Sequence, residues 1–217
     1  MAESRDQRGG RETEWRSGSP AFRAGVAELI RVMAGYAPLA ESTCEALAAI
    51  CRPRALRRGE VWVALGSRPR TVGFLVEGLM RAYAMTEDGR EYTKIYFTEG
   101  MMPAAVVALL TGEPTRIALD ALEDCRLIEY DHDGYRALLD SSPDLLRYHC
   151  RYLEENWILA KEPREVELAQ RTAGERYAAF VEERPDLEER LTLQQIATHL
   201  GITSTQLSRI RRERKNS

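Results

Sequence analysis

The sequence contains no long apolar run, and its few cysteines are widely spaced. The longest apolar stretch, residues 104–110, is far shorter than the roughly 20 residues that a membrane-spanning helix needs. The amino terminus carries no apolar targeting segment. No two of the cysteines form a Cys-x-x-Cys pair or the tight set that an iron-sulfur cluster needs. We therefore expect no membrane association and free thiols in the reducing cytoplasm, at Cys44, Cys51, Cys125 and Cys150.

Catalytic motifs are also missing. There is no glycine-rich phosphate loop, no metal-ligand spacing and no local signature of a Ser-His-Asp set, so we expect no enzyme and no metal centre. Only three histidines, His132, His149 and His199, could serve as an axial ligand of a haem. His132 is expected at a helix start, His149 beside a helical seam and His199 in a carboxy-terminal helix.

The charge is nearly balanced overall but unevenly distributed. With 31 basic and 34 acidic residues the formal charge is −3, which excludes a chain that is positive over its whole surface. Residues 182–190 carry a net charge of −3, whereas residues 209–217 carry +4. Any site for a polyanion is therefore expected at the carboxy-terminal end.

Residues 1–130 contain three segments with different residue patterns. Residues 1–20 have no apolar period and are expected to form a mobile tail. Ser42-Thr43-Cys44-Glu45 has the spacing of a capping box and predicts a helix start. Residues 56–130 then alternate short strand-like runs with glycines, which favours a barrel or jelly roll.

One hairpin is especially clear in this region. In MRAYAMTEDGREYTKIYF, Asp88-Gly89 is predicted to form a tight turn with positive φ values between two strands of alternating polarity. The fold class that follows is α+β, with a jelly-roll or β-roll domain over residues 21–140.

A long helix is predicted over residues 141–162, starting at Ser142-Pro143. Its apolar residues form a narrow stripe that is typical of a seam with a second copy of the chain; contact with the helix's own domain is the alternative. The stripe consists of Leu146, Cys150, Leu153, Trp157 and Ala160. A further helix carries Val166, Ala169, Ala173, Tyr177 and Phe180 and ends at Arg184-Pro185.

Two Thr-x-x-Gln motifs start eleven residues apart, at Thr192 and Thr203. Each can cap a helix reciprocally, and Gly201 can end the first helix in a left-handed conformation. The apolar residues around them complete a small shared core, which predicts a helix-turn-helix within a domain over residues 163–217. These core residues are Ile196, Ala197, Leu200, Ile202, Leu207 and Ile210.

The second helix leaves polar and basic side chains outside. Arginine can chelate the two major-groove acceptors of guanine, and serine and threonine can reach bases or phosphates. The predicted partner is double-stranded DNA. The predicted contacts are Thr203, Ser204, Thr205, Gln206, Ser208, Arg209 and Arg212.

The order of these elements resembles the Crp/Fnr transcription regulators over roughly residues 25–214. The stretches that carry the resemblance are GLMRAYAMTEDGREYTKIYFTEG, RIALDALEDCRLIEYD and IATHLGITSTQLSRIRR. The resemblance implies a cyclic-nucleotide-binding-like roll, a homodimer on a palindromic operator, a contact with RNA polymerase and an effector in the roll. Ser208-Arg209 matches the family's recognition helix, but Thr205 stands where a glutamate is frequent, so base preference at that position is open.

The effector region departs further from members that bind cyclic AMP. Gly100 is kept, but Met101 replaces the first acid and Ala104-Ala105 replaces the second Gly-Glu pair, which leaves Thr115 and Arg116 as polar phosphate ligands. We therefore do not expect cyclic AMP, and the effector and any cofactor stay unidentified. The apolar stretch 103–110 either lines a pocket for an apolar effector or a haem, or forms core. The predicted effector region also includes Met102, Asn156 and Trp157.

One alternative function stays open. The chain could be a small-molecule sensor or interaction module whose helix-turn-helix no longer binds DNA, because the glutamate of the recognition pattern is absent.

Overall fold

The computed structural model describes residues 15–159 and 171–215. The chain divides into two compact units, one formed by Met1–Ala82 with Tyr96–Tyr152 and the other by Tyr83–Ile95 with Leu153–Ser217. In the described ranges, no helix is long and apolar enough to cross a membrane. The predictions for Ala160, Val166 and Ala169 lie outside the described residues.

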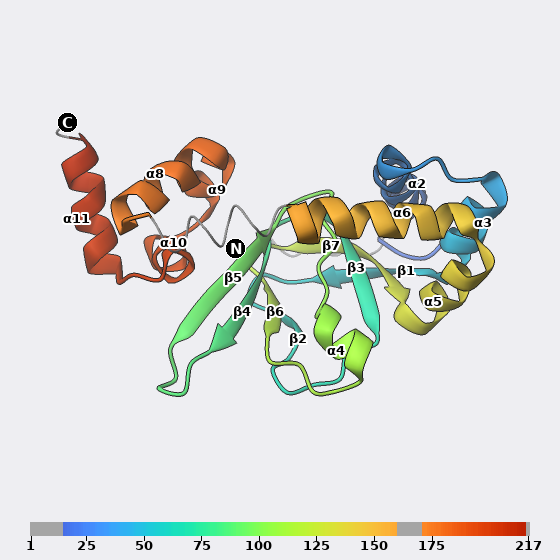
Figure 1. Cartoon of the computed structure of the whole chain (residues 1–217), viewed down its shortest axis with the longest axis horizontal. Helices are drawn as coiled ribbons and strands as arrows, with labels where there is room; N and C mark the ends of the chain where they lie inside the picture. The colour runs from blue at the N-terminus through green and yellow to red at the C-terminus, as the bar shows by residue number, and fades with distance from the viewer. Residues whose placement is uncertain (1–14, 160–170, 216–217) are drawn as a thin grey trace, which may run out of the picture. The chain divides into compact units, whose positions relative to one another are not determined.

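The strands form two open antiparallel layers (Figure 1). One sheet has the order β1-β7-β3 and the other β2-β6-β4-β5. This confirms the predicted α+β class with a β-roll; neither sheet of the described residues closes into a barrel. The strands are β1 (Cys51–Leu56), β2 (Val61–Val63), β3 (Thr71–Glu77), β4 (Met80–Met85), β5 (Glu91–Phe97), β6 (Ala118–Ala121) and β7 (Cys125–Asp131).

β4 and β5 form the predicted hairpin, but its turn differs from the prediction. The connection is five residues long, from Thr86 to Arg90, and Thr86 N donates to Arg90 O at 2.9 Å. Gly89 has a φ of 78°, whereas Asp88 does not take a positive φ. The Thr86 hydroxyl stabilises the wider loop because it accepts from the Arg90 amide and has the Asp88 carboxylate and the Arg90 carbonyl oxygen within hydrogen-bonding distance of its single proton.

The prediction of a mobile tail over residues 1–20 is wrong for residues 15–20, which are ordered; the rest of that prediction lies outside the described residues. The Trp15 ring is buried in the core of the roll, and its Nε1 donates to Arg54 O at 3.0 Å. Ser19 accepts from Phe22 N and caps α2 (Pro20–Tyr36). Burial of the indole offsets the entropy cost of ordering this segment, which composition alone did not reveal.

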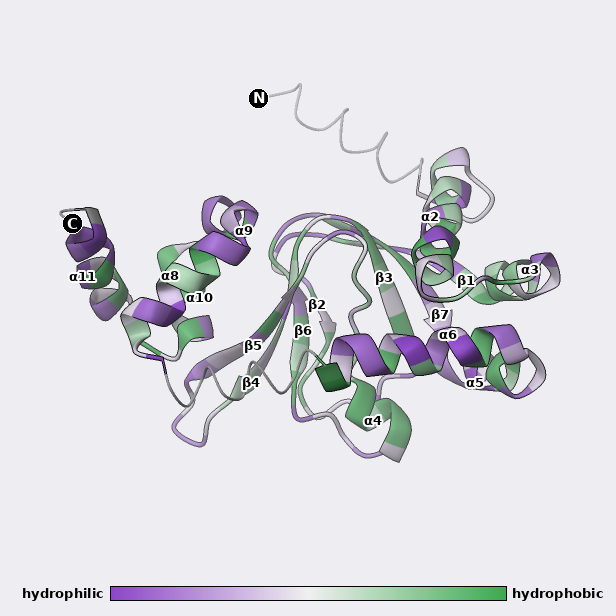
Figure 2. Cartoon of the chain, turned by 45° about the horizontal axis from the view of Figure 1, so that its top comes forward, coloured by the Kyte–Doolittle hydropathy of each residue, from purple (hydrophilic) through white to green (hydrophobic). Residues whose placement is uncertain are grey.

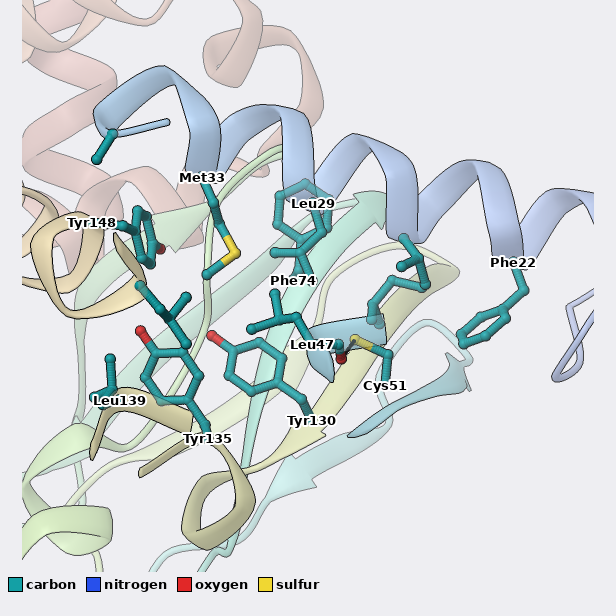
Figure 3. Close-up of a cluster of buried hydrophobic side chains, with 14 of the residues drawn as sticks. Phe22, Leu29, Met33, Leu47, Cys51, Phe74, Tyr130, Tyr135, Leu139 and Tyr148 are labelled. Atoms are coloured by element: carbon teal, nitrogen blue, oxygen red, sulfur yellow. Dashed lines mark hydrogen bonds between the residues drawn. The ribbon is translucent and has the colours of Figure 1, made fainter. Parts of the chain in front are cut away.

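The main core lies between α2 and the sheet β1-β7-β3 (Figure 3). Leu29 and Met33 of α2, Phe74 of β3 and Ile128 of β7 are fully buried there. α3 (Glu41–Ile50) and α5 (His132–Ser141) close its end, and α5 begins at His132 as predicted. The short helix α4 (Val106–Thr111) follows the loop after β5.

The predicted capping box at Ser42 is wrong. The N-cap of α3 is Ala40, which has no capping side chain. The Asp144 carboxylate of α6 (Pro143–Leu153) accepts from Ala40 N at 2.7 Å and from the Thr43 hydroxyl at 3.0 Å. These bonds hold the pKa of Asp144 below its usual range. The cap therefore comes from a distant residue and not from the local motif.

α6 presents two different faces (Figure 2). Leu145 and Tyr148 are buried, and Arg151 Nη1 donates to Tyr36 O at 2.7 Å. Leu146 and Cys150, from the predicted seam, are exposed. The helix then changes to a π-helix, η1 (Glu154–Leu159), whose longer hydrogen-bonded turn rotates Trp157 relative to the strict α-helical stripe.

The carboxy-terminal part of the second unit is a small helical cluster. It comprises α8 (Ala173–Glu183), α9 (Pro185–Arg190), α10 (Leu193–Leu200) and α11 (Ser204–Lys215). Its buried core consists of Tyr177, Phe180, Leu187, Leu191, Ile196, Ala197, Leu200 and Leu207.

Candidate nucleic-acid interface and effector region

α10 and α11 form the predicted helix-turn-helix, and both predicted capping boxes are present. Thr192 and Gln195 bond each other reciprocally at the start of α10. At the start of α11, Thr203 N donates to Gln206 Oε1 at 2.9 Å and Gln206 N donates to Thr203 Oγ1 at 3.2 Å. Gly201 ends α10 with φ 68°. Local side-chain bonds thus fix where both helices begin.

α11 is amphipathic, and its polar side faces solvent. Leu207 is fully buried against α10, whereas Thr205, Ser208, Arg209 and Arg212 are exposed. These four positions recur at the spacing that places side chains on one helical face. The Arg209 side chain is 65% exposed, and Glu213 lies 3.6 Å from it. A distance of this length between exposed groups leaves the guanidinium available to a ligand.

Three of the predicted contacts also serve the fold. Thr203 and Gln206 are exposed but cap α11. The Ser204 hydroxyl donates to Gln194 Oε1 of α10. These side chains position the start of α11, so the outward face formed by Thr205, Ser208, Arg209 and Arg212 is the stronger candidate for base contact.

Arg211 points inward, which the count of basic residues did not show. Its Nε donates to the Tyr177 hydroxyl at 2.9 Å, and its Nη2 donates to Glu188 Oε1 at 2.7 Å. The Tyr177 hydroxyl also donates to Glu188, and together these bonds lower the pKa of Glu188. Since residue 211 lies four positions after the buried Leu207, the helical period could have placed it on the inner face.

The predicted effector loop lies beside β3. Gly100 N donates to Leu75 O at 2.8 Å, and Leu75 N donates to Met101 O at 2.9 Å. Gly100 has a φ of 85°. The Met101 sulfur accepts from the amide and hydroxyl of Thr98. The loop is therefore tied to the roll by backbone bonds, with a thioether where cyclic-AMP-binding members carry an acid.

The other predicted phosphate ligands do not form a set. Thr115 is buried and its hydroxyl bonds the backbone of Ile117, whereas Arg116 is exposed. In the described part of the chain, the Arg116 guanidinium makes no ion pair or hydrogen bond with a side chain. Ala105 is buried and Ala104 half-buried. Neutralising a phosphate would therefore depend on one solvated arginine.

The apolar stretch 103–110 is divided between core and surface. Pro103, Ala105 and Ala108 are buried, whereas Val107 and Leu110 of α4 are exposed. Figure 2 shows α4 as a hydrophobic helix. Asn156 and Trp157 are exposed on η1, and their predicted role in effector binding stays a prediction.

A buried ion pair in the roll was missed by sequence reasoning. Arg81 of β4 and Asp120 of β6 lie on neighbouring strands, and Arg81 Nε and Nη2 donate to the two Asp120 oxygens at 3.0 and 3.1 Å. Both side chains are nearly buried. Nothing local marks either residue, because the pairing depends on strand order.

Tyrosines and one histidine gather on the inner side of α6. Tyr148 and Tyr152 stack edgewise against Tyr36, and the Tyr135 hydroxyl lies 3.2 Å from His149 Nδ1. Burial, followed by the charge of Arg136, lowers the pKa of His149. His149 thus faces the core and not the exposed stripe, and His199 lies in α10 as predicted. Over the described ranges, no cluster of three or more His, Cys, Asp or Glu side chains could hold a metal ion.

Comparison with known proteins agrees with this architecture. Residues 53–142 match the cyclic nucleotide-binding domain family. The structure of FixK2 from Bradyrhizobium japonicum is similar with a TM-score of 0.65 and 20% identity, over 76% of this chain and 84% of that one. CLP, the c-di-GMP responsive global regulator of Xanthomonas campestris, gives a TM-score of 0.67 and 17% identity, over 82% and 92%.

A third structure, a transcriptional regulator of the Crp/Fnr family from Eubacterium rectale, gives a TM-score of 0.60 and 16% identity, over 81% of this chain and 83% of that one. The chain has the Crp/Fnr fold. The residues that match the cyclic nucleotide-binding domain, 53–142, include all strands from β2 to β7 and β1 from Pro53 onward, and the helix-turn-helix follows them in the chain. No curated protein matches the sequence.

Proposed function

We propose that the chain is a sequence-specific DNA-binding transcription regulator and not an enzyme. The observation that carries this proposal is the outward face of α11. Its apolar side is buried against α10, while Arg209, Arg212 and short hydroxyl side chains face solvent. A helix of this kind fits the major groove, where arginine can bind guanine with two hydrogen bonds.

The proposed organisation follows the three sequence regions. Residues 21–140 form the sensor roll, residues 141–162 the dimerisation helix and residues 163–217 the DNA-binding domain. The exposed apolar residues Leu146, Cys150 and Trp157 support a homodimer, because solvent-exposed apolar side chains on one helix favour burial against a second copy. Such a dimer places two recognition helices about 34 Å apart on a palindromic operator. We propose RNA polymerase as a further partner.

The proposed effector is not cyclic AMP. Met101 occupies the position of an acid and Thr115 is satisfied within the roll, so the chain lacks most of the groups that would neutralise a cyclic phosphate. Ligands that bind the folded roll raise its melting temperature. A thermal shift screen with cyclic nucleotides, cyclic di-GMP, haem and nitric oxide donors therefore tests which chemical class of effector binds the roll.

Selection from a random double-stranded DNA library tests the function. The full chain is expected to enrich a palindromic sequence and to bind it far more tightly than a scrambled duplex, because base contacts add to the phosphate term. Enrichment of no sequence, with equal weak binding to every duplex, contradicts the proposal. That outcome would support the alternative of a sensor or interaction module without DNA.

A further inference from the structure

Two buried phenol groups converge on one methionine sulfur in the sensor roll. Met102 lies in the loop before α4, and its sulfur accepts from the Tyr148 hydroxyl of α6 at 3.2 Å and from the Tyr130 hydroxyl of β7 at 3.9 Å. Tyr148 is 2% exposed and Tyr130 is 4% exposed. Within the described residues, neither hydroxyl has another hydrogen-bond partner. Figure 3 shows both tyrosines in the core beneath α2.

This pairing leaves strong donors with a weak acceptor. A buried tyrosine hydroxyl usually bonds an oxygen, whereas a thioether sulfur accepts only weakly. Burial raises the pKa of Tyr130 and Tyr148 well above the usual range for tyrosine, so both remain protonated donors at any physiological pH. An oxygen at the position of the sulfur lone pairs would form stronger bonds with the same hydroxyls.

The geometry points to Met102 as a site of reversible oxidation, at which a hydroperoxide converts the thioether into a sulfoxide whose oxygen is held by Tyr130 and Tyr148. The sulfur lone pair attacks one peroxide oxygen, so that an S–O bond forms and the O–O bond breaks. The departing oxygen leaves as water when the oxidant is hydrogen peroxide. The sulfur loses two electrons and the peroxide gains them.

Other methionines of the roll lack this combination. Met33 and Met80 are fully buried, which closes them to an oxidant. Met101 faces the side chain and amide of Thr98 and not two buried phenols. Met85 is 42% exposed and its sulfur has no hydrogen bond in the described part of the structure. Met102 is only partly buried and packs against the core, and its sulfur contacts both phenols.

Oxidation of Met102 would affect α6 through Tyr148. The added oxygen must fit between the sulfur and the Tyr148 hydroxyl, which are in contact, so Tyr148 has to shift. Its ring packs edgewise on Tyr36 and beside Tyr152, and a shift therefore moves the buried face of α6. The effect on operator binding rests on the proposed function, because it requires that the exposed face of α6 forms the dimer. The oxidation itself does not.

The test is a stability cycle on the full chain. Wild type and the double variant Tyr130→Phe/Tyr148→Phe are treated with hydrogen peroxide, and mass spectrometry of peptides follows Met102 and Met85. Before treatment both proteins should melt at nearly the same temperature. After conversion of Met102, the double variant should melt lower than oxidised wild type by about 4 to 8 °C, because it cannot bond the sulfoxide oxygen.

Two controls make the result specific. Met102→Leu should remove the response to peroxide, and Met85→Leu should leave it intact. Methionine sulfoxide reductase should restore the original melting temperature. The inference is overturned if Met102 stays unmodified while Met85 is oxidised, or if oxidation lowers the melting temperature equally in wild type and double variant. None of these readouts uses DNA, so a failure of DNA binding leaves them unaffected.

Discussion

At the scale of single residues, Arg209 and Arg211 are two positions apart on α11 but differ completely in surroundings. Arg209 is solvent-exposed, whereas Arg211 is partly buried and bonds Tyr177 and Glu188 of the same domain. The pair can separate the proposed recognition of DNA from domain stability, because each arginine serves as the control for the other.

Arg209→Ala is expected to cost about 1 to 3 kcal/mol of binding to the selected operator and to relax base preference, while the domain keeps its melting temperature. Arg211→Ala should instead lower the melting temperature of the domain, because it removes the bonds to Tyr177 and Glu188. Fluorescence anisotropy against the operator and a scrambled duplex, with thermal melts of both variants, measures this. If Arg209→Ala weakens binding equally on all sequences, the residue contacts phosphate; Lys215→Ala, by comparison, should mainly reduce the salt dependence.

The Arg81 and Asp120 pair gives a second prediction at this scale. Arg81→Met should lower the free energy of unfolding by about 3 to 5 kcal/mol, because it leaves the Asp120 carboxylate buried without a partner. The double variant Arg81→Met/Asp120→Leu should regain most of that loss. Urea unfolding of wild type, Arg81→Met, Asp120→Leu and the double variant gives the coupling free energy between the two side chains. If the losses of the two single variants simply add in the double variant, the two side chains do not stabilise each other.

Residue-level prediction from the sequence was therefore uneven for a physical reason. The outward position of Arg209 follows from the helical period that buries Leu207, and the same period could have placed Arg211. Arg81 and Asp120 meet only because β4 and β6 are neighbours, and Met102 meets Tyr148 through tertiary contacts. Such long-range pairs leave no local pattern.

At the scale of helices and strands, local chemistry decided which boundaries could be predicted. The capping boxes at Thr192 and Thr203 use side chains three residues away, and both are present. The motif at Ser42 failed because Asp144, far along the chain, caps that helix instead. The hairpin around Asp88-Gly89 was predicted correctly, but its connection is a five-residue loop, stabilised by the Thr86 side chain, and not the predicted tight turn.

Gly201 offers a prediction for the turn of the helix-turn-helix. Gly201→Ala should lower stability by about 1 kcal/mol, because its φ of 68° is unfavourable for any residue with a Cβ. Gly174→Ala is the matched control. It lies in α8 with open space around it and no positive φ, so the substitution should be neutral or slightly stabilising. Thermal melts that show the same effect for both would contradict a role of the left-handed cap.

At the scale of the whole molecule, the order of a β-roll, a long helix and a helix-turn-helix was readable from composition and motifs. Strand-like runs with regular glycines predicted the roll, and the paired caps predicted the last domain. The sequence did not reveal that α6 gives way to a π-helix at Glu154. It also gave no effector, because pocket chemistry depends on side chains brought together by folding.

Trp157→Ala tests the proposed assembly. Trp157 is 42% exposed on η1, and loss of its ring should weaken dimerisation and operator binding together, since aromatic anchors dominate protein interfaces. Val107→Ala removes a comparably exposed apolar side chain from α4 and should change neither. Analytical ultracentrifugation across a concentration series measures the dimer. If Trp157→Ala still forms the dimer and binds DNA with unchanged affinity, the proposed dimer contact through Trp157 is wrong.

The bonds at the two ends of α6 limit how this helix can move. Near its start Asp144 holds the first turn of α3, and near its end Arg151 holds the last residue of α2. If α6 slid along its own axis, both hydrogen bonds would break at once. The two bonds therefore hold α6 in place relative to α2 and α3. Directly beyond α6 the hydrogen-bonding pattern changes at Glu154 to the π-helical turn η1, so neither attachment restrains the chain from that residue onward.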